Sequence, residues 1–179
     1  FPSIFDRTDV AGIQKFRDAV QKGGAEAVWT ILQKRGIVGG AAKPVNSINS
    51  SFLNCEPSKG CAKFCYATKG NYQYVNAIIK GELSDWAVTT NPKRAADMAA
   101  LEYASMPEFQ LDKALRVFDK GDGNSQWIEF IKELNNIRYD NKPIRVQVFS
   151  KHPDFLREVP EMNVRLLSID DTNIELADE

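Results

Sequence analysis

The spacing of hydrophobic residues along the chain changes near residue 40. Before that point, apolar residues return every three or four positions in two short stretches, as they do on one face of a helix. These positions are Val10, Ile13, Phe16 and Val20, followed by Val28, Ile31 and Leu32. The stretch from residue 39 to 44 then contains two glycines and a proline. The pattern predicts a small N-terminal helical segment over residues 1–40, with a domain boundary in the loop that follows.

Beyond this loop, short apolar stretches typical of strands alternate with stretches of helical spacing. We expect strands over residues 45–52, 115–118, 144–149 and 164–169, and helices over residues 71–80, 95–104, 125–137 and 153–158. This alternation predicts an α/β domain over residues 41–179. Its core would be a parallel sheet of about four strands joined by right-handed crossover helices.

Composition and charge exclude several classes of protein. Of the 179 residues, 43% are hydrophobic, which is typical of a folded chain with a sizeable core. Lys and Arg number 23 against 24 Asp and Glu, so a broadly basic nucleic-acid-binding surface is excluded, whereas a local basic groove is not. No apolar stretch is long enough to span a membrane and no signal peptide is visible, so we expect a cytoplasmic protein. The chain starts with Phe1, and we interpret it as a piece of a longer protein, truncated at its C-terminus.

The three cysteines lie close together, with the spacing C-x5-C-x3-C from Cys55 through Cys61 to Cys65. Clustered thiols in a reducing compartment are typical of a metal or redox centre. Structural zinc takes four protein ligands, and His152 is a candidate for the fourth. A four-iron cluster held by three cysteines leaves one iron open to a small molecule. A 4Fe–4S cluster and zinc are therefore both candidates, beside the simpler alternative of structural thiols.

Polar residues follow each of the expected strands. The cysteine loop follows the first strand, residues 119–123 the second and residues 150–152 the third, while Ser168, Asp170 and Asp171 lie in the last residues and exit of the fourth. In parallel α/β architectures, ligands bind at the carboxyl ends of the strands. We therefore expect these four groups to converge on one edge of the sheet.

The cysteine loop resembles that of the radical S-adenosylmethionine enzymes, whose usual spacing is C-x3-C-x2-C with an aromatic residue before the third cysteine, here Phe64. The resemblance implies a partial β/α barrel, a 4Fe–4S cluster on the three cysteines and S-adenosylmethionine on its open iron. It also implies that the turn after the second strand binds the cofactor's amino group, while residues after later strands bind its carboxylate and ribose. The turn residues are Asp119, Gly121, Asp122 and Gly123, and the later residues are Ser150, Lys151 and Ser168.

A second resemblance covers roughly residues 45–171. Its motifs are Cys65-Tyr66-Ala67 at the end of the cysteine loop, Gly121-Asp122 after one strand, Ser150-Lys151 after the next and Ser168 in the last. In this order they resemble the gene product 88 family of phages and mobile elements. This resemblance implies a phage or mobile-element protein and no particular substrate.

Two functions are consistent with these observations. The first is an iron–sulfur enzyme of the radical S-adenosylmethionine type, acting on a substrate that the sequence does not identify. The second is a non-catalytic binding module, in which zinc or a cluster staples the cysteine loop and a partner protein or nucleic acid binds the surface.

Overall fold

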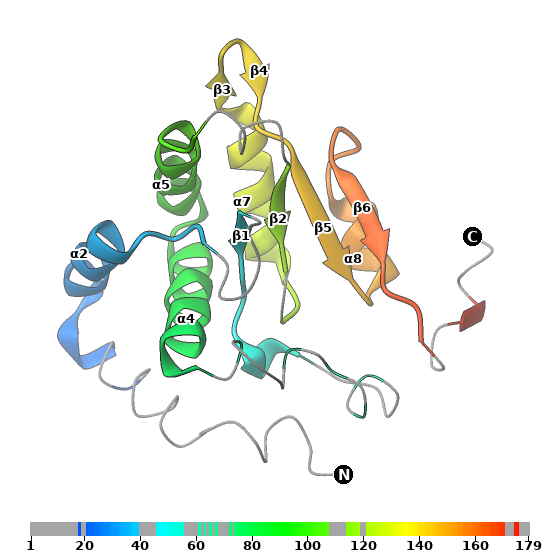
Figure 1. Cartoon of the computed structure of the whole chain (residues 1–179), viewed down its shortest axis with the longest axis horizontal. Helices are drawn as coiled ribbons and strands as arrows, with labels where there is room; N and C mark the ends of the chain where they lie inside the picture. The colour runs from blue at the N-terminus through cyan, green and yellow to red at the C-terminus, as the bar shows by residue number, and fades with distance from the viewer. Residues whose placement is uncertain are drawn as a thin grey trace.

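The fold combines a parallel sheet, its covering helices and a small hairpin (Figure 1). The computed structural model describes residues 18, 21–39, 46–55, 61, 63, 65, 67, 72, 74–107, 114–118, 121–170 and 174–175. Within these ranges, no helix has both the length and the apolar character that crossing a membrane requires.

The sheet confirms the parallel α/β architecture expected from the sequence. Its order is β1-β2-β5-β6, formed by β1 (Ser47–Ile48), β2 (Leu115–Val117), β5 (Val146–Ser150) and β6 (Val164–Leu167). Each neighbouring pair is parallel, with Val117 beside both Ile48 and Val148. The third pair joins β5 to β6 in the same sense. The four carboxyl ends therefore lie at one edge of the sheet, toward the bottom of Figure 1, where the arrowheads of β5 and β6 point.

Helices occupy the connections between the strands, as the sequence predicts. The helices α4 (Val75–Thr90) and α5 (Pro92–Ala104) lie between β1 and β2, α7 (Ser125–Asn136) follows β2, and α8 (Pro153–Glu158) follows β5. Asparagine side chains cap two of them, because Asn91 accepts from the Arg94 N–H at 3.0 Å and Asn124 accepts from the Trp127 N–H at 3.4 Å. The helix α4 continues to residue 90, beyond its expected end at residue 80.

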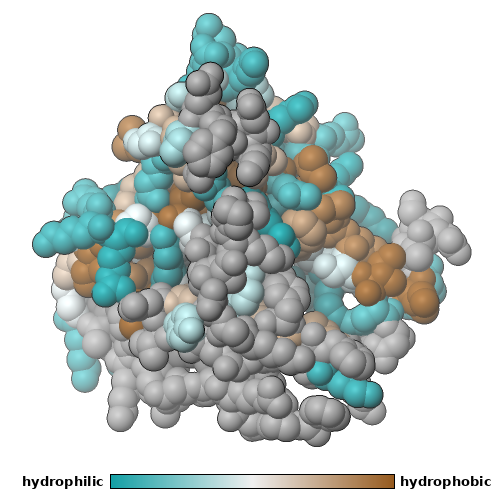
Figure 2. Space-filling view, viewed as in Figure 1, coloured by the Kyte–Doolittle hydropathy of each residue, from teal (hydrophilic) through white to brown (hydrophobic). Residues whose placement is uncertain are grey.

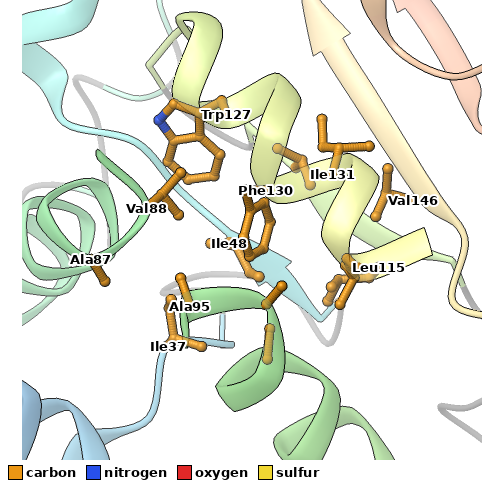
Figure 3. Close-up of a cluster of buried hydrophobic side chains, with 14 of the residues drawn as sticks. Ile37, Ile48, Ala87, Val88, Ala95, Leu115, Trp127, Phe130, Ile131 and Val146 are labelled. Carbon is orange, nitrogen blue, oxygen red and sulfur yellow. The ribbon is translucent and has the colours of Figure 1, made fainter. Parts of the chain in front are cut away.

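The main core lies between one face of the sheet and these helices. Alternate strand residues such as Leu115, Val117, Val146 and Val148 are fully buried, which is the period-two pattern of a sheet with one face packed on the core. In Figure 3, Phe130 and Ile131 of α7 meet Ile48, Leu115 and Val146 of the strands, with Ala87, Val88 and Ala95 of α4 and α5 beside them. The helices thus hold the strand ends in fixed positions.

Two local features differ from the sequence-based expectation. The first strand is much shorter than residues 45–52, because the chain turns after Ile48 and enters a 3-10 helix, η2 (Phe52–Asn54). A hairpin, β3 (Arg138–Tyr139) with β4 (Lys142–Pro143), was not expected. Its two-residue turn, Asp140–Asn141, has positive φ at both positions, which is the geometry of a tight hairpin turn. The hairpin projects at the top of Figure 1, and its surface is hydrophilic in Figure 2.

The N-terminal helix α2 (Ala25–Arg35) packs against the rest of the molecule. Val28, Trp29 and Leu32 belong to the same buried cluster as the strands. After the helix, Glu102 of α5 accepts the backbone N–H groups of Ile37 and Val38 at 2.6 and 2.8 Å. These contacts hold α2 against the helical layer, while the domain boundary near residue 40 stays a prediction.

Candidate functional site

Residues from three strand ends meet at the carboxyl edge of the sheet. Asp122 follows β2, Ser150 ends β5, and Lys151 comes directly after it. The Ser150 hydroxyl donates to Asp122 Oδ1 at 3.0 Å, and the Ser168 N–H donates to the Ser150 carbonyl oxygen at 2.8 Å. The structure thus brings together the Gly-Asp turn and the exits of β5 and β6. Asp119, which was expected at the same site, lies outside the described residues.

Asp122 is a buried carboxyl group, with 7% of its surface exposed. Burial raises its pKa above the ordinary value, and this effect outweighs His152, the Ser150 hydroxyl and Lys151, all of which favour the ionised form. The His152 Nε2 atom lies 3.7 Å from Asp122 Oδ2, beyond hydrogen-bonding distance. A desolvated carboxylate at a strand end is typical of a ligand-binding position.

Lys151 connects this edge to the cysteine loop. Its ammonium group forms an ion pair with Asp170 and also donates a hydrogen bond to the Cys61 side chain. The positive charge of Lys151 lowers the pKa of the Cys61 thiol, and the negative charge of Asp122 raises it. The loop that leaves β1 therefore lies next to the groups that follow β2 and β5.

The three cysteines are near one another, and the pKa values of Cys61 and Cys65 are shifted in opposite directions. A hydrogen bond from Cys65, reinforced by Lys151, lowers the pKa of Cys61 to about 6. The same hydrogen bond raises the pKa of Cys65, and burial and the charges of Cys61 and Cys55 act in the same direction. All three thiols are half-buried and form no disulfide. Among the residues that the structure describes, no three His, Cys, Asp or Glu side chains are arranged so as to hold a metal ion.

Comparison with known proteins gives a family and nothing closer. The family model described as Gene product 88 matches residues 15–176, which is most of the chain. The chain belongs to the gene product 88 family. Searches of the curated proteins and of the solved structures each found no match. The gene product 88 match includes α2 and the whole sheet, so it extends further toward the N-terminus than the resemblance seen in the motifs.

In this gene product 88 protein, the Gly-Asp turn fits tightly against the exit of β1. Gly121 has φ +77°, and a Cβ atom there would lie 2.1 Å from Ser50 Oγ and 2.7 Å from the Ser51 carbonyl oxygen. A side chain at Gly123 would collide with the ring of Phe118, at 2.4 Å. Phe118 is itself buried and has φ +65°, a conformation that is costly for a bulky residue. Both glycines are therefore needed for close approach of backbone and rings.

A buried polar junction, not expected from the sequence, joins the helix α4 to the start of the cysteine loop. Ser51 donates to Glu82 Oε1, and Asn54 Nδ2 donates to Asp85 Oδ1 at 2.8 Å. The sequence contained one indication of this junction. Glu82 and Asp85 are three residues apart, so on a helix they share one face, and the apolar residues Leu83 and Trp86 follow them with the same spacing. The expected end of the helix at residue 80 concealed this spacing.

Proposed function

We propose that this gene product 88 protein is an iron–sulfur protein in which Cys55, Cys61 and Cys65 bind a 4Fe–4S cluster beside a site for S-adenosylmethionine. One observation carries the proposal. Lys151, after β5, donates a hydrogen bond to Cys61 in the loop that leaves β1, and the charge of Asp122, after β2, is close enough to change the pKa of the same thiol. Groups of the kinds required by a cluster and by an amino-acid cofactor are thus adjacent. The parallel sheet, in which strand order follows chain order, supports a partial β/α barrel.

The donor chemistry at the loop fits a cluster. Thiolates are the ligands of iron–sulfur clusters, and the lowered pKa of Cys61, about 6, favours its thiolate at neutral pH. Bound metal would also remove the proton of Cys65, whose pKa is raised in the metal-free protein mainly by its hydrogen bond to Cys61. Binding of the cluster would therefore break the Cys61–Cys65 hydrogen bond, and both sulfur atoms would become metal ligands.

The residues beside the loop suit the amino and carboxylate groups of the cofactor. Asp122 would accept hydrogen bonds from an ammonium group, which would stabilise the charged form that burial now disfavours. Lys151, directly after the neighbouring strand β5, is a charged donor and would bind the carboxylate, while the Ser150 hydroxyl donates to Asp122. When bound and reduced, the cluster would supply the electron that cleaves S-adenosylmethionine to a carbon radical.

A non-catalytic module stapled by zinc is the second candidate. The spacing of the cysteines is longer than that of the radical enzymes, and three thiols with His152 as a fourth ligand would also match a zinc donor set. In that case Asp122 and Lys151 would have structural roles only. Metal analysis separates the two candidates.

The first experiment is anaerobic purification and reconstitution with iron and sulfide. We expect a brown protein with a broad absorption band near ~400 nm and about four irons per chain. Single Cys→Ser variants at the three positions should lose the iron, whereas the exposed Asp97→Ala variant should keep it. Stoichiometric zinc in place of iron would support the module.

The second experiment tests the cofactor by titrating the reconstituted protein with S-adenosylmethionine in a calorimeter. Asp122→Ala should weaken binding by about tenfold or more and leave the iron content unchanged, because a charge-assisted hydrogen bond is lost. If the wild-type protein shows no binding at millimolar cofactor, the enzyme proposal is wrong and only the metal-binding loop remains.

A further inference from the structure

The cysteine loop begins at a junction that is anchored from two sides. Ser51 directly precedes η2, Asn54 is the last residue of η2, and Cys55 follows as its C-terminal cap. Ser51 is fully buried, and its hydroxyl accepts the Leu53 N–H at 3.0 Å while donating to Glu82. The backbone is therefore fixed just before the first cysteine.

Asp85 of α4 is the central group of this junction. One carboxylate oxygen, Oδ1, accepts from Asn54 Nδ2 at 2.8 Å and from the Trp127 indole Nε1 at 3.0 Å. Trp127 is fully buried in the first turn of α7, and its ring contacts that of Phe118 with centroids 4.8 Å apart. Asp85 thus connects the residue before Cys55 to the helix that follows the Gly-Asp turn.

A carboxylate at this position is costly for the fold. Asp85 and Glu82 are only 7% and 4% exposed, and removing carboxylates from water destabilises a folded protein unless each finds good partners. An apolar residue could fill the same space on α4. A buried carboxylate here gains something that an apolar residue lacks, which is a directed contact to Asn54.

Opposite α4, the Gly-Asp turn lies against the same segment. Gly121 leaves no room for a Cβ atom against Ser50 and Ser51. The exit of β1 is consequently held between α4 and the turn that carries Asp122. Cys55 comes directly after this exit and η2, so any shift of the exit would displace Cys55.

We infer that Asp85 is a positioning residue for the cysteine centre: through Asn54 it holds Cys55 in the place where its thiol acts with those of Cys61 and Cys65. The inference deepens the proposed function and rests on it for the identity of the metal. The positioning of Cys55 can be measured without any metal.

The test is the alkylation rate of each cysteine in the metal-free, reduced protein, read by peptide mass spectrometry after iodoacetamide treatment. Asp85→Ala should raise the rate at Cys55 relative to Cys61 by about tenfold, the factor expected for loss of a hydrogen bond to a charged group. Asp97→Ala, at an exposed position on α5, is the matched control and should leave the ratio unchanged.

A side-chain exchange gives the rescue. In the double variant Asn54→Asp with Asp85→Asn, the amide at position 85 can donate to the new carboxylate and still accept from Trp127. The Cys55:Cys61 rate ratio should return to within about threefold of wild type. Asn54→Ala, which removes the donor from the loop side, serves as a second variant if Asp85→Ala does not fold.

The outcomes separate a positioning role from a purely structural one. If all three cysteines become reactive together and the melting temperature falls, Asp85 supports the fold as a whole and the inference is wrong. An unchanged Cys55:Cys61 ratio in a folded Asp85→Ala or Asn54→Ala variant also overturns it. Failure of the exchange to restore the ratio counts against it in the same way.

A cobalt(II) titration then relates positioning to metal binding. We expect wild-type protein to develop the near-ultraviolet thiolate-to-cobalt band, and Asp85→Ala to need about tenfold more cobalt. If wild-type protein binds neither cobalt nor iron, the proposed function fails, while the alkylation ratios still decide the role of Asp85. If both proteins bind cobalt equally, the positioning inference fails and the metal site stands.

Discussion

The two edges of the parallel sheet are held together by different kinds of polar side chain. At the amino edge, the buried pair Asn135 and Asn163 exchanges two hydrogen bonds, at 3.0 and 2.7 Å, and Asn163 also accepts the Val146 N–H at 3.0 Å. At the carboxyl edge, the buried or half-buried groups include Asp122 and Lys151, which carry charge.

This difference distinguishes stabilising polar groups from groups available for chemistry. Neutral amides that satisfy each other and the backbone cost little to bury and fix the geometry of the strand starts. Ionisable groups whose pKa values are shifted by burial or by neighbouring charges are held at a cost, and such groups gather at functional sites. We therefore expect that replacing a polar side chain mainly changes stability at the amino edge and mainly changes chemistry at the carboxyl edge.

The largest effect is expected for Asn163→Ala. The substitution leaves the Val146 N–H and the Asn135 side chain buried with an acceptor removed, so the free energy of unfolding should fall by about 3 kcal/mol. Urea unfolding measures it, with Asn136→Ala on the exposed side of α7 as the control. A loss no greater than that of the control would contradict the view of this pair as a stabilising device.

Gly121→Ala is expected to come next, with a loss of roughly 2 kcal/mol. A methyl group there would approach Ser50 Oγ and the Ser51 carbonyl oxygen, in addition to the cost of φ +77°. Gly24→Ala is a matched control, because Gly24 has φ +78° with nothing within 4 Å of the added Cβ, and should lose only about 1 kcal/mol. Equal losses of unfolding free energy in the two variants would mean that the turn does not pack tightly against the exit of β1.

Asp122→Asn should change stability less than the two preceding substitutions, and in a pH-dependent way. Because the folded-state pKa of Asp122 is raised, its contribution is fully present below pH 3.8 and is lost as pH rises through the raised value. Wild type should therefore lose stability relative to Asp122→Asn between pH 4 and neutral pH. Urea unfolding across this range measures the difference, and a wild type that gains on the variant as pH rises would contradict the burial of the carboxylate.

The smallest expected effect concerns the reactivity of one thiol. In metal-free protein, alkylation of Cys61 should follow a titration with its midpoint near the pKa of about 6. Lys151→Gln should move the midpoint upward by about one pH unit, because a positive charge that favours the thiolate is removed. Iodoacetamide rates from pH 5 to 9 measure it. A midpoint that stays in place would show that Cys65 alone lowers the pKa.

Much of the fold could be predicted from periodicity. The alternation of strand and helix after residue 45 gives the parallel sheet, and α8 begins and ends where proline and spacing predict. The length of β1 could not be predicted, because Val45 to Phe52 alternates like a strand while the tertiary contacts of Ser50 and Ser51 with α4 and Gly121 end it early.

One part of the candidate site could likewise be predicted from the sequence, and another part could not. Topology predicts that Asp122, Ser150 and Lys151 share an edge, because parallel strands bring their carboxyl ends together. The junction at Asp85 depends on hydrogen bonds between residues 31 and 42 positions apart in sequence, and periodicity contains no information about such pairs. Whether the three cysteines hold metal stays a prediction.

The strand order also has a consequence for the order in which the chain folds. The β5–β6 pair closes over residues 151–163, whereas the β1–β2 pair closes over residues 49–114, a loop about five times longer. The longer closure costs about 1.4 kcal/mol more in chain entropy, and β1 offers only two residues in return. We expect β5, β6 and α8 to form early and β1 to join last. Cys55, which follows β1 and η2, would then reach its final position only after the other three strands have paired.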